Sequence, residues 1–204
     1  MLLRVHPENP APRHIKMILD VFEKGGVVIF PTDTIYGMGC SIRHIRTVDR
    51  IAQIKGEKKN QSNYSFIFNN LSMLSDFTAP LDNPVFKLMK RNLPGPFTFI
   101  VEANNNIPKL FHNKKRTIGI RIPDNKVIHA IIEELGHPIL TTSIHDEDEI
   151  VEYTTDPELI YEKYEDRVDL VIHAGYGDNE ASTIVDCTSG DIEIIRQGKG
   201  ILEE

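Results

Sequence analysis

Short apolar runs alternate with amphipathic segments along the whole chain, a pattern typical of helices that pack against a sheet. In the first amphipathic segment, Ile15, Ile18 and Phe22 recur at helical spacing and therefore share one face. Continuous apolar runs bounded by glycine or proline predict buried strands. The predicted helices are 14–24, 47–55, 84–92, 126–135 and a segment that starts at Asp156, and the predicted strands are 27–30, 64–68, 97–101, 117–121, 138–142, 170–172, 183–185 and 192–196.

Several helix ends carry their own sequence signals. Pro84 falls in the first turn of its helix, and Gly136 directly follows the helix at 126–135. Asp156 is the expected N-cap of the next helix, because its side chain can accept a backbone hydrogen bond while Pro157 occupies the first helical position. The alternation of helices and strands predicts an α/β or α+β fold with a mixed sheet.

Length and composition indicate one ordinary globular domain. The 204 residues contain no low-complexity segment, repeat or linker, so a single domain is expected over 1–204. No apolar run approaches the roughly 20 residues that cross a bilayer, and the N-terminus lacks the features of a signal peptide. The two cysteines have no metal-ligand spacing and suggest no disulfide framework. A cytoplasmic protein without membrane contact is expected.

The net charge of −7 argues against a protein whose whole surface binds nucleic acid. Basic residues are nevertheless clustered, so the sequence still allows the interpretation of a local basic groove on an acidic molecule. Each cluster, taken singly, is also typical of a solvated face. The clusters are Lys55, Lys58 and Lys59, then Lys87, Lys90 and Arg91, and then Lys114, Lys115, Arg116 and Arg121.

The most informative segment, PTDTIYGMGC at residues 31–40, follows the apolar strand at 27–30. It is expected to leave the sheet as a backbone-rich loop. The hydroxyls of Thr32 and Thr34, the carboxylate of Asp33 and the phenol of Tyr36 would then gather where open α/β sheets bind ligands. The alternative is a plain turn whose two glycines supply positive φ angles. Spacing alone leaves both interpretations open.

This segment resembles the opening signature of the YrdC-like superfamily, which includes the threonylcarbamoyl-adenylate synthases and the YciO proteins. The further matching motifs follow in the expected order and cover nearly the whole chain. They are KGE at 55–57, PGPFT at 94–98, GIRIP at 119–123, Thr142-Ser143, ASTIVD at 181–186 and IRQG at 195–198. The resemblance implies a YrdC-like domain: a twisted mixed sheet flanked by helices, with a large concave groove.

In the synthases that the chain resembles, L-threonine, bicarbonate and ATP form threonylcarbamoyl-AMP and pyrophosphate, and this intermediate serves a later tRNA modification. The resemblance therefore implies a nucleotidyltransferase-type reaction with ATP as substrate and Mg²⁺ as a candidate ion. Negative charge builds on phosphoryl oxygens in such a reaction. The site needs fixed cations and hydroxyl donors more than it needs a covalent nucleophile.

By resemblance, Lys55 and Arg121 are the candidate catalytic cations. Lys55 matches the lysine of a family Lys-x-Arg pair and would bind phosphate, and the alternative is a solvent-facing lysine at a helix end. Arg121 would bind the amino-acid carboxylate or a nucleotide phosphate. Its alternative is a structural salt bridge, because a charge between apolar neighbours is costly unless it is paired or faces a cleft.

The resemblance also implies a set of binding residues, with no assigned metal ligands. Ser182 would donate a hydroxyl, and Arg196 would lie by the nucleotide. The acidic run DEDE at 146–149 has no counterpart in the synthases and is interpreted either as a solvated loop or as a Mg²⁺ site. The implied substrate- and nucleotide-binding residues are Thr32, Thr34, Tyr36, Lys58, Ser143, His145, Ser182 and Arg196.

Two positions depart from the synthase pattern. Glu57 stands where the synthases have arginine, and His145 takes the place of an asparagine. Both fall on the phosphate side of the implied site, which favours the YciO branch. Three hypotheses stay open: a threonylcarbamoyl-AMP synthase, a YciO-type module that binds nucleotide, double-stranded RNA or tRNA without turnover, and a hydrolase or transferase that uses the groove for other chemistry. RNA would be bound mainly through phosphate and sugar contacts.

Overall fold

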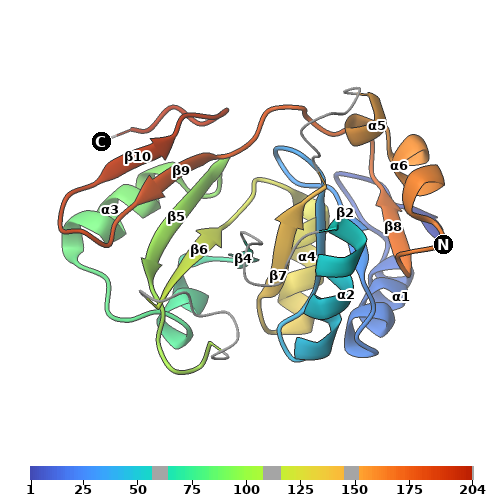
Figure 1. Ribbon diagram of the computed structural model, residues 1–204, viewed down its shortest axis with the longest axis horizontal. Coiled ribbons are helices and arrows are strands. Elements are labelled where there is room, and N and C mark those ends of the chain that lie inside the picture. The colour runs from blue at the N-terminus through green and yellow to red at the C-terminus, as the bar shows by residue number, and fades with distance from the viewer. Residues whose placement is uncertain (57–63, 108–115, 145–151, 204) are drawn as a thin grey trace.

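The computed structural model describes residues 1–56, 64–107, 116–144 and 152–203. Its described residues form one mixed sheet of ten strands with helices packed on it (Figure 1). The strand order is β1-β8-β2-β3-β7-β4-β6-β5-β9-β10. The strands are β1 (Leu2–Arg4), β2 (Val28–Phe30), β3 (Gly37–Ser41), β4 (Ser65–Ile67), β5 (Phe97–Glu102), β6 (Thr117–Arg121), β7 (Ile139–Ser143), β8 (Leu170–His173), β9 (Thr183–Asp186) and β10 (Glu193–Arg196).

The helices bury two separate apolar layers against this sheet. The layer under α1 and α4 contains Phe22 and Ile131 together with Val28 of β2. The opposite layer contains Ile51 of α2 and Met89 of α3, and it extends along both halves of the sheet. The helices are α1 (Pro12–Glu23), α2 (Ile45–Lys55), α3 (Asn83–Asn92), α4 (Lys126–Leu135), α5 (Glu152–Thr155) and α6 (Pro157–Tyr164), with a 3₁₀ helix η1 (Leu71–Asp76). The sheet flanked by helices confirms the predicted mixed α/β fold.

The local signals were good guides to the helix ends. Helix α4 begins and ends at the predicted residues, and Gly136 closes it in the left-handed conformation with φ of 69°. The Asp156 side chain accepts a hydrogen bond from the Glu158 N–H, and Pro157 opens α6 as predicted. These features depend only on neighbours in the sequence, which is why they could be predicted without the fold.

The segment after β2 was predicted wrongly beyond Tyr36. Only residues 31–36 leave the sheet, and Gly37–Ser41 return as β3, antiparallel to both β2 and β7. Neither glycine of the motif has a positive φ. A Cβ at Gly39 would instead lie 2.2 Å from the Leu140 carbonyl oxygen. The glycine therefore allows close approach of a neighbouring strand and does not serve a turn.

The residues after β10 fold back onto β9, and we call residues 197–203 the C-terminal segment. Thr183 of β9 is fully buried and fixes this segment through its hydroxyl. The Thr183 Oγ1 donates to the Gly200 carbonyl at 2.6 Å and accepts from the Gly198 N–H at 2.9 Å. The hydroxyl of one threonine thus makes two of the contacts that hold this segment against β9.

Replacing Thr183 with valine is expected to lower the free energy of unfolding by about 1–3 kcal/mol, because the Gly198 N–H loses its partner. Urea denaturation measures the loss. Thr78→Val is the matched control: Thr78 is also buried, but it donates to the Leu74 carbonyl, which already accepts two backbone N–H groups. Equal losses in the two variants would contradict this role of Thr183.

Candidate functional site

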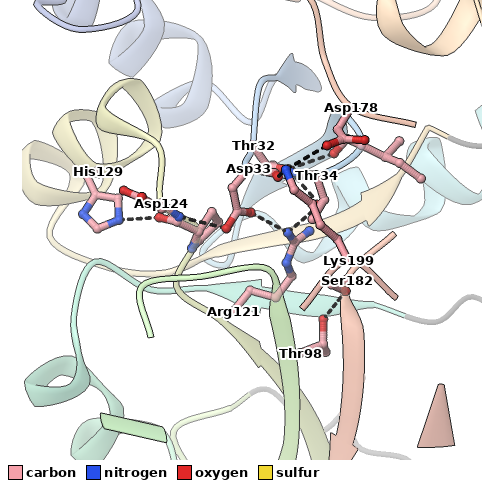
Figure 2. A network of polar contacts seen from close by, with 12 residues as sticks. Thr32, Asp33, Thr34, Thr98, Arg121, Asp124, His129, Asp178, Ser182 and Lys199 are labelled. Atoms are coloured by element: carbon pink, nitrogen blue, oxygen red, sulfur yellow. Dashed lines mark hydrogen bonds and ion pairs between the residues drawn. The ribbon is translucent and has the colours of Figure 1, made fainter. Parts of the chain in front are cut away.

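The loop at 31–36 meets the end of strand β6 in a buried ion pair (Figure 2). Arg121 is the last residue of β6. Its Nη2 donates to Asp33 Oδ1 at 3.1 Å and to Thr34 Oγ1 at 2.7 Å. The side chains of Arg121 and Asp33 are only 10% and 9% exposed. The fold therefore brings Arg121, the predicted cation, together with the part of the 31–40 motif that precedes β3.

The two threonine hydroxyls of this loop have different tasks. Thr32 Oγ1 donates to the Ile35 carbonyl at 2.9 Å and accepts from the Thr34 N–H at 3.0 Å, so it fixes the shape of the loop. Thr34 Oγ1 lies 3.1 Å from the hydroxyl of Thr32 and accepts from Arg121. Both residues are buried. Thr34 is thus the hydroxyl that is joined directly to the cation.

The charge of Arg121 is balanced only in part. Burial lowers the pKa of its guanidinium, Asp33 opposes this, and the positive charge of Arg196 lowers the pKa further. The Nε–H of Arg121 is buried and has no hydrogen-bond partner among the described residues. Buried polar groups without partners are rare and costly in folded proteins. The positive charge of Arg196 near Arg121, together with the unused Nε–H donor, makes this place suited to bind an anion.

Arg196 ends β10, Ser182 immediately precedes β9, and the two residues lie against each other. Arg196 donates from Nη2 and Nε to the Ser182 carbonyl at 2.8 and 3.3 Å. The Ser182 hydroxyl lies 2.8 Å from that of Thr98 in β5. Burial lowers the pKa of Arg196 as well. A backbone contact thus fixes Arg196 near Arg121 without neutralising either charge.

Lys55 and Ser143 form a second cluster. Lys55 ends α2, and its Nζ donates to the Ser143 carbonyl at 2.8 Å. Ser143 is the last residue of β7 and pairs with Gly37 of β3. Arg121 lies near the other end of β7, because it pairs with Ile67 of β4, and Ile67 pairs with Ile139, the first residue of β7. The predicted site residues therefore form two groups, separated along β7, and the 31–36 loop joins them. The Ile144 N–H donates to the Tyr36 carbonyl on the Ser143 side.

Tyr36 itself serves the fold. Its side chain is fully buried, and its hydroxyl donates to the Gly175 carbonyl at 2.8 Å. Burial raises the pKa of the phenol to about 12. A Cβ at Gly177 would lie 2.5 Å from the Tyr36 ring. The ring is enclosed by the loop after β8, so its position gives no support to the expected ligand contact.

Three residues that the motifs emphasised, Glu57, Lys58 and His145, lie outside the described residues, as does the acidic run at 146–149. Their predicted roles stay predictions. Within the described ranges, no three His, Cys, Asp or Glu side chains lie close enough together to hold a metal ion. None of the described helices is long and apolar enough to span a membrane.

Lys199 and Asp178 were not predicted from the sequence. Lys199 Nζ donates to the Asp33 carbonyl at 2.8 Å and forms an ion pair with Asp178 Oδ2 at 2.7 Å. The Asp178 N–H donates to the Thr34 carbonyl at 3.2 Å. The available signal was the lysine between Gly198 and Gly200, immediately after the IRQG motif.

This fold, in which the arginines that end β6 and β10 lie near the threonines of the loop after β2, defines a protein of the Sua5/YciO/YrdC class. Residues 20–198 match the sequence model of that family, which carries the description "Telomere recombination", and the chain belongs to this family. The predicted membership of the YrdC-like superfamily and the likeness to its YciO branch are confirmed.

Particular relatives agree with this assignment. The chain is 40% identical over 199 residues to an uncharacterized protein of Haemophilus influenzae, covering 96% of this chain and 94% of that one. It is 37% identical over 198 residues to YciO of Escherichia coli K12, again covering 96% and 94%. The crystal structure of E. coli YciO matches with a TM-score of 0.90 at 36% identity, covering 98% of this chain and 97% of that one.

More distant structures share the fold alone. The crystal structure of P. abyssi Sua5 complexed with L-threonine matches with a TM-score of 0.87 at 22% identity. The match covers 97% of this chain and 57% of that one. The fold is therefore shared while most side chains differ.

Proposed function

We propose that this protein binds L-threonine and ATP beside Arg121 and Arg196 and joins them with bicarbonate into threonylcarbamoyl-AMP. The observation that carries the proposal is the incomplete pairing of Arg121, whose buried Nε–H has no partner and whose pKa is lowered by burial and by Arg196. A carboxylate or a phosphate would accept hydrogen bonds from both guanidinium groups. The threonine-bound Sua5 structure of the same fold supports the choice of amino acid.

The reaction needs positioned charge more than a nucleophile from the protein. The threonine nitrogen first forms a bond to the bicarbonate carbon, and an amine proton leaves with the bicarbonate hydroxyl as water, which gives the carbamate. A carbamate oxygen then forms a bond to the α-phosphorus of ATP, and the bond from that phosphorus to the bridging oxygen breaks, so pyrophosphate leaves with the electron pair. Lys55 would supply a point charge to the phosphates, and Arg121 would orient an anionic group by its planar fork. Mg²⁺ would enter with the phosphates of ATP as part of the substrate.

Pyrophosphate release tests the proposal. Release is expected only when ATP, L-threonine and bicarbonate are all present. Arg121→Lys keeps the charge and loses the fork, so it should weaken binding of the anionic substrate about tenfold or more. Arg91→Lys, an exposed arginine on α3, is the matched control and should behave as wild type. No release at saturating concentrations of all three substrates would reject the synthase reaction.

Helix α3 favours a second candidate, the binding of double-stranded RNA or tRNA. Its exposed surface carries Phe86, Lys87, Lys90 and Arg91, which follow one another at helical spacing. The positive charges on this face would attract the phosphate backbone of RNA, and RNA binding would weaken steeply as the salt concentration rises. A gel shift at low salt that is lost in a Lys90→Glu, Arg91→Glu variant would favour this candidate. No shift at micromolar protein would reject it.

A further inference from the structure

We infer that Lys199 is a positioning residue that holds the 31–36 loop in place, so that Thr34 and Asp33 present Arg121 to its anionic ligand. The inference rests on the proposed function for the identity of that ligand. Lys199 lies just outside the IRQG motif at 195–198. It adds a contact from the C-terminal segment to a loop that β6, the turn after it and the loop before β9 also hold.

The loop is held from three sides (Figure 2). From β6 and the turn after it, Arg121 binds the Asp33 carboxylate, and the Asp124 N–H donates to Asp33 Oδ2 at 3.0 Å. From the loop before β9, the Asp178 N–H donates to the Thr34 carbonyl. From the C-terminal segment, Lys199 donates to the Asp33 carbonyl. The ion pair between Lys199 and Asp178 links the C-terminal segment to the loop before β9, so these two contacts hold the 31–36 loop together.

The base of Lys199 is rigid, which a positioning residue requires. Its backbone N–H donates to the Ala181 carbonyl at 2.9 Å. The preceding Gly198 lies so close to the residues before β9 that a Cβ there would be 2.2 Å from the same carbonyl oxygen. Further along, Asn92 of α3 and the backbone of Glu203 exchange two hydrogen bonds of 2.8 and 2.9 Å. The segment thus carries Lys199 on an anchored backbone.

The ion pair with Asp178 is half-exposed, with 39% of the Lys199 side chain and 32% of the Asp178 side chain accessible. Exposed pairs of this kind add little to global stability. The contact is nevertheless a direct one at 2.7 Å, and the hydrogen bond from Lys199 lowers the pKa of Asp178. Removing Lys199 should therefore loosen the 31–36 loop and weaken ligand binding while leaving the melting temperature nearly unchanged.

The test compares Lys199→Met with wild type in two measurements. In the ligand-free protein, amide hydrogen exchange of residues 33–36 should be about tenfold faster in the variant. L-Threonine and ATP, titrated separately by calorimetry, should bind about tenfold more weakly. Lys199→Arg, which keeps a charged donor, should restore most of both properties. Lys16→Met, on the exposed face of α1, is the matched control and should change neither.

The outcomes separate this inference from the proposed function. If wild type binds neither ligand, the proposed function fails, and hydrogen exchange alone decides whether Lys199 holds the loop. Unchanged exchange in Lys199→Met overturns the inference whatever the ligands do. If wild type binds the ligands and Lys199→Met shows faster exchange but the same affinity, the inference is also overturned, because the contact from Lys199 would then have no effect on ligand binding.

Discussion

Replacing Asp33 with alanine is expected to lower the free energy of unfolding by about 3–5 kcal/mol. Asp33 is the only described carboxylate that forms an ion pair with Arg121. Its removal leaves a guanidinium that is 10% exposed without a counter-charge. A buried charge without compensation is strongly destabilising, whereas the intact pair adds little. Urea denaturation, monitored by circular dichroism, measures the change.

Two further variants make this prediction specific. Asp124→Ala removes an exposed carboxylate three residues after Arg121. The backbone N–H of residue 124 still donates to Asp33, so this variant should lower the free energy of unfolding only slightly. The double variant Asp33→Ala, Arg121→Met buries neither charge and should regain most of the lost stability. If the double variant is as unstable as Asp33→Ala alone, the loss does not come from the charge of Arg121. Added ATP should partly stabilise Asp33→Ala if an anion binds there.

The elements that could be predicted from the sequence are those with local signals. Strand β6 and helix α4 begin and end where predicted, because apolar spacing and a closing glycine define them. Strand β1 had no such signal: three residues pair in parallel with β8, and Leu2 faces Val171. Strand β3 was missed since GMGCS lacks the branched residues of a typical strand. It forms because β2 and β7 offer hydrogen bonds on both sides.

The candidate site could be predicted in part. Residue type and motif pointed to Thr34, Arg121 and Arg196, whose side chains or charges the fold brings together. Sequence could not show that Asp33 would be the partner of Arg121, because the pair joins positions 88 residues apart. The burial of Tyr36 was equally hidden, since its enclosure comes from the loop at 175–177. Contacts between distant segments were the part that motifs could not supply.

The protein is expected to lose most of its stability in alkali, as pH rises from about 9 to about 12. Burial raises the pKa of the Cys40 thiol from 9.0 to about 12 and that of the Tyr36 phenol from 10.0 to about 12. Well below pH 9, both groups keep their protons in the folded and the unfolded chain. Above it, the unfolded chain releases them first, so unfolding becomes more favourable until the folded values are reached.

The size of the loss follows from about 1.4 kcal/mol for each pH unit between the two pKa values, which gives about 4 kcal/mol for Cys40 and about 3 kcal/mol for Tyr36. Variants separate the two contributions. Cys40→Ala and Tyr36→Phe should both be less stable at neutral pH, because one loses packing and the other a hydrogen bond. Each should nevertheless show a smaller fall between pH 8 and 11, measured by urea denaturation under reducing conditions. An equal fall in wild type and in Cys40→Ala would mean that the thiol ionises without unfolding, which its complete burial in β3 argues against.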